Sequence, residues 1–391
     1  MSQPLPRSRS VLFASIAIAL GLFGSLAALE IVLRLLPVPE WLRSPSVTHD
    51  DPYLRYLPNQ DSVWSVGWDF QIVNRVHVNR QGFVNQQDYD PKARSPLLAV
   101  VGDSYVEALV VPYEDTLHGR LAKTVGARGR VYSFGIAGSP LSQYLVYAEH
   151  ARSVYHPDGL AIVIVDNDFD ESLLEYKSAP GFHYLRRRED GSLELTLVPY
   201  HAHSSWLKSM ARESALFRYL YPLGLHALIA WVGGGDPATA YLGRGRVPAQ
   251  AHAARVERSK QAVDFFLNEL PRYAGLPEAR IALLVDGMRP ELYDNNQLSA
   301  AQATFFAAMR RYLINEARRR GYGTIDMQER FIARHACDGA RFEWAIDGHW
   351  NRIAHEEAML AILDSSVPSA VFGSLPQPNR ACHFPASVRA P

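Results

Sequence analysis

From Leu97 onward, short apolar runs alternate with longer segments in which apolar residues recur at helical spacing. Short apolar runs bounded by glycine, proline or polar residues favour buried strands. Strands that alternate with helices predict a parallel sheet with helices on both faces, which is the α/β class. We expect five strands, at Leu97–Val101, Arg130–Phe134, Leu160–Val165, Arg280–Val285 and Gly323–Met327. We expect helices near Asp115–Val125, Ser139–Tyr155, Ala253–Leu270, Ser299–Arg320 and Arg352–Leu363.

Polar or glycine-containing segments stand directly after three of these strands. Gly102-Asp103-Ser104 follows the first, Gly135-Ile136-Ala137-Gly138 the second, and Asp166-Asn167-Asp168 the third. Ligand sites of open parallel sheets lie at the carboxyl ends of the strands. These segments are therefore the candidates for a functional site.

Asp347-Gly348-His349-Trp350, far downstream, supplies the residue types that a serine nucleophile needs. A serine hydroxyl becomes a good nucleophile when a histidine takes its proton, and a carboxylate fixes the histidine tautomer and stabilises its charged form. We therefore predict that Ser104, His349 and Asp347 form one catalytic site, with Asp103 and Trp350 in supporting positions.

Each of these residues also has a purely structural interpretation. Ser104 could be a turn serine that caps a helix. His349 could be a buried histidine with satisfied hydrogen bonds, and Asp347 the N-cap of the next helix. Gly138 could serve only a tight turn, and Trp350 could pack in the core instead of walling the site.

Taken together, these four blocks resemble the SGNH hydrolase superfamily, also called the GDSL type, which is named for Ser, Gly, Asn and His in four blocks. The resemblance covers about residues 97–365. It implies a flavodoxin-like three-layer α/β/α sandwich. It also implies an oxyanion hole made by the backbone N–H groups of Ser104 and Gly138 and the side-chain amide of Asn167, with Ser104, His349 and Asp347 as the catalytic residues.

The chain departs from the family pattern at two points. Val165 stands where the third block usually has glycine, and one residue instead of two separates Asp347 from His349. The shorter Asp-x-His-Trp form resembles that of membrane-anchored and polysaccharide-modifying members. The segment from Asn79 to Phe83 and an apolar run near the N-terminus also resemble the anchored subgroup.

The resemblance implies a serine ester hydrolase that works through an acyl-enzyme, with no cofactor and no metal. For an exported domain, the expected substrate is an acyl ester, with acetyl as the expected acyl group, of an envelope or exported carbohydrate. A second hypothesis is an O-acetyltransferase that moves the acetyl group onto a polysaccharide. A third is a non-catalytic carbohydrate-binding protein.

Three alternating carboxylates, Asp166, Asp168 and Asp170, suggest a calcium loop. However, Glu171 stands where such a loop needs glycine, and Lys177 stands where it needs the closing glutamate. No metal site is therefore expected here.

The run Val11–Leu29 carries no charge and is long enough to span a hydrocarbon core. Arg7 and Arg9 precede it, which favours a cytoplasmic N-terminus and places the remainder on the extracytoplasmic, periplasmic side. We expect a single-pass membrane anchor because apolar residues resume between Ile31 and Leu36. The alternative is a signal peptide cleaved near Ser25-Leu26-Ala27, which would give a secreted protein.

Composition shifts divide the chain into four segments. They are a cytoplasmic stub with the anchor (1–36), an irregular or short-stranded lead-in packed on the main domain (37–95), the catalytic domain (96–368) and a Pro-rich tail (369–391).

Within the catalytic domain, residues 172–250 interrupt the alternation of strands and helices and are expected to form an inserted cap. The insertion begins with a predicted hairpin, His183–Arg188 and Leu193–Val198, around an Asp-Gly turn. It continues in an apolar stretch, Leu216–Trp231, that ends at Gly233-Gly234-Gly235.

Forty basic residues balance forty acidic ones, so the charge offers no attraction to nucleic acid. The expected partners are an acylated carbohydrate or another small ester, and the membrane. Cys337 and Cys382 are the only cysteines. In an exported domain they could pair and tie the tail beside the loop of Asp347 and His349, or they could remain two buried thiols.

Overall fold

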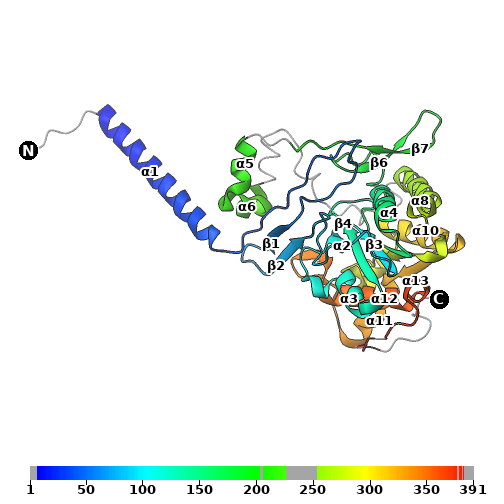
Figure 1. Ribbon diagram of the computed structural model, residues 1–391. Coiled ribbons are helices and arrows are strands. Elements are labelled where there is room, and N and C mark those ends of the chain that lie inside the picture. Colours follow the sequence, from blue (N-terminus) through cyan, green and yellow to red (C-terminus); the bar gives the residue numbers. More distant parts are fainter. Residues whose placement is uncertain (1–6, 203–205, 226–252, 377, 381, 383–391) are drawn as a thin grey trace, which may run out of the picture. The chain divides into compact units, whose positions relative to one another are not determined.

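The five apolar runs form the strands of one sheet in the computed structural model, which Figure 1 shows. The strands are β3 (Leu97–Gly102), β4 (Arg130–Gly135), β5 (Gly159–Ile164), β8 (Ile281–Val285) and β9 (Gly323–Asp326). They lie in the order β4-β3-β5-β8-β9, and every pairing is parallel. The predicted α/β class with a five-stranded sheet is confirmed.

The order of the strands changes direction between β3 and β5. The chain runs from β3 outward to β4, then crosses back to β5 and continues to β8 and β9. This is the flavodoxin-like order of doubly wound sheets, in which ligand sites lie beyond the carboxyl ends of the strands where the direction changes. The residues that follow Gly102 and Ile164 therefore occupy the position where a site is expected.

Helices cover both faces of the sheet, because alternate residues of each buried strand point to opposite faces. Val101 of β3 belongs to a core that contains Leu145 and Phe266, whereas the neighbouring Val100 belongs to a second core with Leu121. The first face is covered by α4 (Leu141–Tyr155), α8 (Ala253–Ala274) and α10 (Phe305–Arg319). The second face is covered by α3 (Leu117–Val125), α11 (Met327–Asp338), α12 (Arg352–Asp364) and α13 (Ser366–Phe372). The fold is thus a three-layer α/β/α sandwich.

The chain divides into a larger unit (residues 42–61, 74–202 and 241–391) and a smaller unit (residues 1–41, 62–73 and 203–240). The structure describes residues 7–202, 206–225, 253–376, 378–380 and 382. The whole sheet lies in the larger unit. The predicted segment boundaries, including the cap at 172–250 and the tail from 369, stay predictions.

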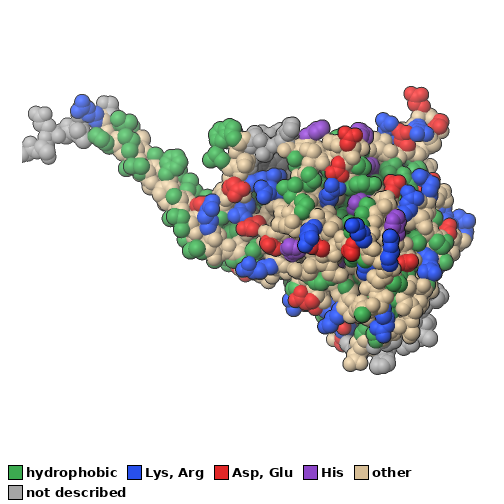
Figure 2. Space-filling model, viewed as in Figure 1, with side chains coloured by type: hydrophobic (Ala, Val, Ile, Leu, Met, Phe, Trp, Pro, Cys, Tyr) green, Lys and Arg blue, Asp and Glu red, His purple; other side chains and the backbone are tan. Residues whose placement is uncertain are grey.

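In the smaller unit, α1 (Arg7–Arg34) exposes apolar side chains along its length, as the green surface in Figure 2 shows. Its Val11–Arg34 segment is long and apolar enough to cross a membrane, and no other helix in the described part of the chain is. An N-terminal signal sequence has the same properties, so the helix by itself does not decide between an anchor and a cleaved peptide.

Two short helices within the predicted insertion, α5 (Trp206–Glu213) and α6 (Ala215–Leu220), belong to the smaller unit. Glu30 of α1 caps α6, since its carboxylate accepts hydrogen bonds from the Ser214 hydroxyl (2.9 Å) and from the backbone N–H of Ala215 (3.0 Å). The second half of the predicted apolar stretch, from residue 226, and the three glycines lie outside the described residues.

The prediction of one helix over Ser299–Arg320 is wrong. The structure has two helices there, α9 (Asn295–Ala301) and α10, because Thr304 caps α10 by accepting a hydrogen bond from the N–H of Ala307 at 3.3 Å. The helices α11 and α13 were not predicted from the sequence. Both are short, and α11 carries many charged residues, so neither shows a long apolar period.

Within residues 37–95, the segment predicted to be a lead-in, β1 (Gln60–Val66) and β2 (Ile72–Val78) form a two-stranded sheet. Downstream of β2, Phe83 and Tyr89 are buried against Phe134 of β4, with ring centroids 5.1 and 5.5 Å away. The predicted hairpin is confirmed, since β6 (His183–Arg187) pairs antiparallel with β7 (Leu193–Leu197).

Cys337 of α11 and Cys382 are joined in a disulfide, with their Cα atoms 6.3 Å apart. Nearby, Arg380 donates to the Asp364 carboxylate at the end of α12, over 3.0 Å. Of the two alternatives for the cysteines, the structure has the paired one.

Candidate active site

Ser104 is the first residue of the short helix α2 (Ser104–Glu107), directly after β3. Two glycines allow this helix to approach the strand ends. A Cβ on Gly102 would lie 2.4 Å from Cγ2 of Val106, and a Cβ on Gly135 would lie 2.7 Å from the backbone nitrogen of the last residue of α2. Distances this short exclude a side chain, so the two glycines set the position of the serine.

Asp103 caps α2, because its Oδ1 accepts a hydrogen bond from the Tyr105 N–H at 2.9 Å. It is buried, and burial raises its pKa to about 6. The other carboxylate oxygen lies 3.4 Å from Ser104 Oγ, which is a long contact for a hydroxyl donor. Asp103 therefore supports the backbone that presents Ser104.

His349 lies between Ser104 and Asp347. Its Nε2 is 2.9 Å from Ser104 Oγ, and its Nδ1 is 2.6 Å from Asp347 Oδ1. His349 and Asp347 belong to β11 (Asp347–Trp350), which pairs with β10 (Glu343–Trp344). Alternate residues of a strand point to the same side, so a spacing with one intervening residue is enough to place the carboxylate against the imidazole.

The charges of this group stabilise the protonated imidazole. Burial would lower the pKa of His349, but the hydrogen bond and charge of Asp347, with the charge of Asp103, raise it above its ordinary value. For Asp347, burial alone would raise the pKa, but the hydrogen bond from His349 holds this pKa below its ordinary value. His349 is thus placed to accept a proton from the serine hydroxyl.

Trp350 does not wall an open site. Its side chain is 0% exposed, and its Nε1 donates to Asp286 Oδ1 at 2.9 Å. Asp286 follows β8 directly, so this hydrogen bond ties β11 to the carboxyl end of the central sheet. Of its two interpretations, core packing is the correct one for Trp350.

Arg289 supports the same strand from another side. Its guanidinium forms an ion pair with Asp286 at 2.5 Å and donates to the carbonyl of Gly348 at 3.2 Å. It also donates to the Tyr105 hydroxyl at 3.1 Å, which in turn donates to the Gly348 carbonyl at 3.2 Å. Since Gly348 separates the carboxylate from the imidazole of the site, these bonds hold the peptide that carries both groups.

Gly138 and Asn167 lie in turns that follow β4 and β5. A backbone hydrogen bond closes each turn, over residues 136–139 and 165–168. Gly138 has a φ of 79°, a conformation that favours glycine. Val165, at the position where the family pattern has glycine, is buried.

Two residues connect these turns. Asn167 Nδ2 donates to Glu171 Oε2 at 3.0 Å, and Lys177 Nζ lies 2.5 Å from the same oxygen. Lys177 also donates to the Gly138 carbonyl at 2.9 Å. No hydrogen bond between Ser104 and either Gly138 or Asn167 is present among the described residues, and their role as oxyanion donors stays a proposal.

Sequence reasoning missed Asp286, Arg289, Tyr105 and the connection through Glu171 and Lys177. A signal for Asp286 was available, because it stands directly after the fourth expected strand, just as Asp166 follows the third. The other residues lie in loops or beside the serine and show no periodic pattern.

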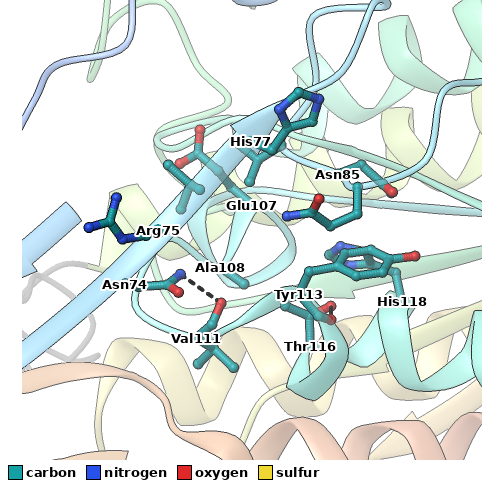
Figure 3. Close-up of a pocket in the computed structure, with 13 residues that line it drawn as sticks. Asn74, Arg75, His77, Asn85, Glu107, Ala108, Val111, Tyr113, Thr116 and His118 are labelled. Atoms are coloured by element: carbon teal, nitrogen blue, oxygen red, sulfur yellow. Dashed lines mark hydrogen bonds between the residues drawn. The ribbon is translucent and has the colours of Figure 1, made fainter. Parts of the chain in front are cut away.

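A small cavity lies beside α2 and β2, and Figure 3 shows the residues that line it. Glu107 and His118 are among them, whereas Ser104 and His349 are not. The Glu107 carboxylate accepts a hydrogen bond from the Tyr56 hydroxyl, and burial raises its pKa to about 7. The cavity thus lies next to the candidate site and contains none of its reactive groups.

The alternating carboxylates after β5 have other partners. Asp168 accepts hydrogen bonds from the Tyr144 hydroxyl (2.9 Å) and the Val165 N–H (2.8 Å), and Asp170 pairs with Arg255. In the part of the chain that the structure describes, no group of three His, Cys, Asp or Glu side chains could hold a metal ion.

Comparison with known proteins finds no matching family model and no matching curated protein. Among solved structures, the chain is similar to TesA at 12% identity, over 67% of this chain and 93% of that one, with a TM-score of 0.33. It is similar to a member of the lipolytic protein G-D-S-L family from Veillonella parvula at 9% identity, over 68% and 94%, with a TM-score of 0.32. An alpha/beta hydrolase enzyme from the metagenome of Lake Arreo has 13% identity, over 72% and 98%, with a TM-score of 0.38.

Proposed function

We propose that this protein is a serine ester hydrolase. Ser104 is the nucleophile and His349 the general base. Asp347 is the carboxylate that orients the imidazole and stabilises its protonated form. The observation that carries the proposal is the hydrogen-bonded series from Ser104 Oγ to His349 Nε2, at 2.9 Å, and from His349 Nδ1 to Asp347, at 2.6 Å.

In the first half of the reaction, Ser104 Oγ attacks the ester carbonyl while His349 Nε2 takes the hydroxyl proton. The tetrahedral intermediate then collapses, the bond to the alcohol breaks, and His349 returns the proton to the leaving alcohol. The acyl group remains as an ester on Ser104.

In the second half, His349 takes a proton from water as the water oxygen attacks the acyl-enzyme. Collapse of the second intermediate releases the acid and returns the proton to Ser104. In this proposal the backbone N–H groups of Ser104 and Gly138 and the amide of Asn167 donate to the oxyanion of both intermediates.

We further propose that α1 anchors the protein in the cell membrane, with the N-terminus in the cytoplasm and the remaining chain in the periplasm. The exposed apolar surface of α1 supports this location, and so does the Cys337–Cys382 disulfide, since disulfides persist in oxidising compartments. The proposed substrates are acetyl esters of an envelope or exported carbohydrate. A secreted form, cleaved after α1, is the alternative.

A second candidate is an O-acetyltransferase, in which a sugar hydroxyl replaces water in the second half of the reaction. The Asp-x-His-Trp spacing on β11 and the apolar helix favour it. Incubation of the acyl-enzyme with an oligosaccharide acceptor separates the two, because only the transferase gives an acetylated oligosaccharide.

The proposal is tested with the full chain in detergent and nitrophenyl acetate as substrate. We expect turnover by the wild type, loss of turnover in Ser104→Ala, and labelling of Ser104 by a serine-directed phosphonate, identified by mass analysis. Equal turnover by wild type and Ser104→Ala would contradict it. A chain that binds carbohydrate but neither turns over esters nor takes the label would be the non-catalytic protein.

A further inference from the structure

We propose that Glu171 and Lys177 are positioning residues that hold Gly138 and Asn167 in place as oxyanion donors. The inference rests on the proposed function, because an oxyanion exists only if Ser104 attacks a carbonyl. It adds two residues that act through others and do not touch the reacting atoms.

Glu171 determines which end of the Asn167 amide lies against its carboxylate. A carboxylate only accepts hydrogen bonds, so the 3.0 Å contact with Glu171 Oε2 requires the amide nitrogen, not the amide oxygen, at that position. The nitrogen carries a second N–H, and no described residue accepts it. In this proposal, that N–H donates to the oxyanion.

Lys177 connects the Asn167 turn to the Gly138 turn. Its ammonium group lies 2.5 Å from Glu171 Oε2 and 2.9 Å from the Gly138 carbonyl oxygen. The carbonyl bond restricts rotation of the peptide between residues 138 and 139, in a turn whose backbone is closed by one hydrogen bond. The Gly138 N–H belongs to the adjoining 137–138 peptide, so Lys177 acts on this donor through the Gly138 backbone. A single cation thus fixes both turns relative to each other.

The surroundings of this pair favour a fixed geometry. The side chains of Lys177 and Glu171 are 22% and 17% exposed, and Lys177 Nζ lies 5.9 Å from the ring centroid of Phe182. A partly buried, charge-assisted hydrogen bond is stronger and better ordered than an exposed one.

The chemical benefit follows from how oxyanion donors work. They act by being in place before the charge develops, and loss of one donor lowers kcat by about 10²–10³-fold in well-studied enzymes. A donor that is present but loosely held gives a smaller loss, with little effect on the affinity for the neutral ground-state ester.

The chain offers a matched control. Lys260 pairs with Glu257 at 2.6 Å and lies 5.4 Å from the ring centroid of Tyr312. Lys260 and Glu257 both belong to α8, and no described hydrogen bond or ion pair joins either of them to the two turns. Lys260→Met therefore removes a lysine–glutamate ion pair that is more exposed (31% and 67%) than that of Lys177, without touching Gly138 or Asn167.

The first measurement is steady-state turnover of nitrophenyl acetate by the full chain. We expect Lys177→Met to lower kcat by about tenfold or more with KM changed less than about twofold. Lys177→Arg, which keeps the charge, should recover part of the loss, and Lys260→Met should match the wild type. A wild-type kcat in a folded Lys177→Met overturns the inference.

The second measurement needs no activity. Hydrogen–deuterium exchange of peptides that cover residues 135–139 and 165–171 should be faster in Lys177→Met than in wild type and Lys260→Met. Unchanged exchange overturns the inference. If wild type and Ser104→Ala are equally inactive, the proposed function fails, and exchange alone decides whether Lys177 orders the turns. If Lys177→Met does not fold, Lys177→Ala and Lys177→Arg replace it in both measurements.

Discussion

At the scale of single residues, His349 sets the expected pH dependence of the proposed reaction. A general base must be neutral, and Asp347 raises the pKa of this imidazole above its ordinary value of 6.5. We expect kcat/KM to rise with pH through a pKa above 6.5. Measurement of kcat/KM from about pH 5 to about pH 9 gives the rising limb of the pH profile and its pKa.

Asp347→Asn tests the cause of that shift. It removes the charge that raises the pKa of His349, whereas burial, which lowers it, remains. We expect the limb to move to lower pH and kcat to fall by about 10³–10⁴-fold. A limb at the same pH in this variant would mean that His349 is not the titrating base.

The raised pKa of Glu107 leads to a separate prediction about stability. Its pKa in the folded protein is about 7, against 4.5 for an ordinary glutamate. Between these values the folded state keeps a proton that the unfolded state loses, so the free energy of unfolding falls as pH rises, by about 3 kcal/mol in all. Below pH 4.5 both states are protonated, and this loss is absent.

Glu107→Gln should remove this dependence. We expect the free energy of unfolding of the variant, relative to that of wild type, to be higher at about pH 8 than at about pH 5. Urea unfolding at the two pH values measures this difference. His118, which lines the same cavity, is buried and has a pKa lowered to about 3, so it stays neutral over this range. A constant difference between variant and wild type would refute the assignment to Glu107.

At the scale of elements, the proposed activity depends on how β11 is fastened to β8 and α2. Arg289 and Asp286 form this fastening, and both side chains are nearly fully buried, at 4% and 6% exposure. Arg289→Met leaves a buried carboxylate without its ion-pair partner, which typically costs about 3–5 kcal/mol of stability.

The double variant Asp286→Asn/Arg289→Met separates stability from positioning. Removing both charges should recover much of the stability, since no unpaired charge remains. The Gly348 carbonyl still lacks its guanidinium donor, so we expect kcat to stay low. Urea unfolding and ester turnover on the same preparations measure the two effects, and full recovery of kcat would show that Arg289 has no positioning role.

At the scale of the whole molecule, the end of the chain is held to the main body by the disulfide. Cys337 and Cys382 are 45 residues apart, and closing a loop of that length stabilises the folded state by about 4 kcal/mol in the chain-entropy account. We expect the double variant Cys337→Ser/Cys382→Ser to melt at a lower temperature and to respond no further to a reductant. Identical melting of variant and oxidised wild type would contradict this.

The whole molecule also explains how Ser104 and His349 meet, although they are 245 residues apart in the sequence. Ser104 follows the first strand of the sheet, and β11 is fastened to the fourth by Asp286. The contact therefore requires the central strands to be in register, and it is a long-range contact of the kind that slows folding.

Several features could be predicted from the sequence because they depend on local patterns. Apolar runs between polar boundaries are enough to find the five strands. Few residue types can act as a serine nucleophile's base and carboxylate, so the candidate residues can also be found from the sequence. The helix boundary at Thr304 was missed because a single capping residue interrupts an otherwise continuous apolar period.

The sequence by itself determined the α/β class, the strand positions and the candidates Ser104, His349 and Asp347, because apolar periodicity and residue chemistry are properties of short segments. Only the tertiary structure decided that Asp286 and Arg289 hold β11, that Lys177 connects two turns, and that Cys337 and Cys382 are bonded. These contacts join side chains on separate loops and helices. Which loop faces which depends on strand order and helix packing, and no local pattern encodes that arrangement.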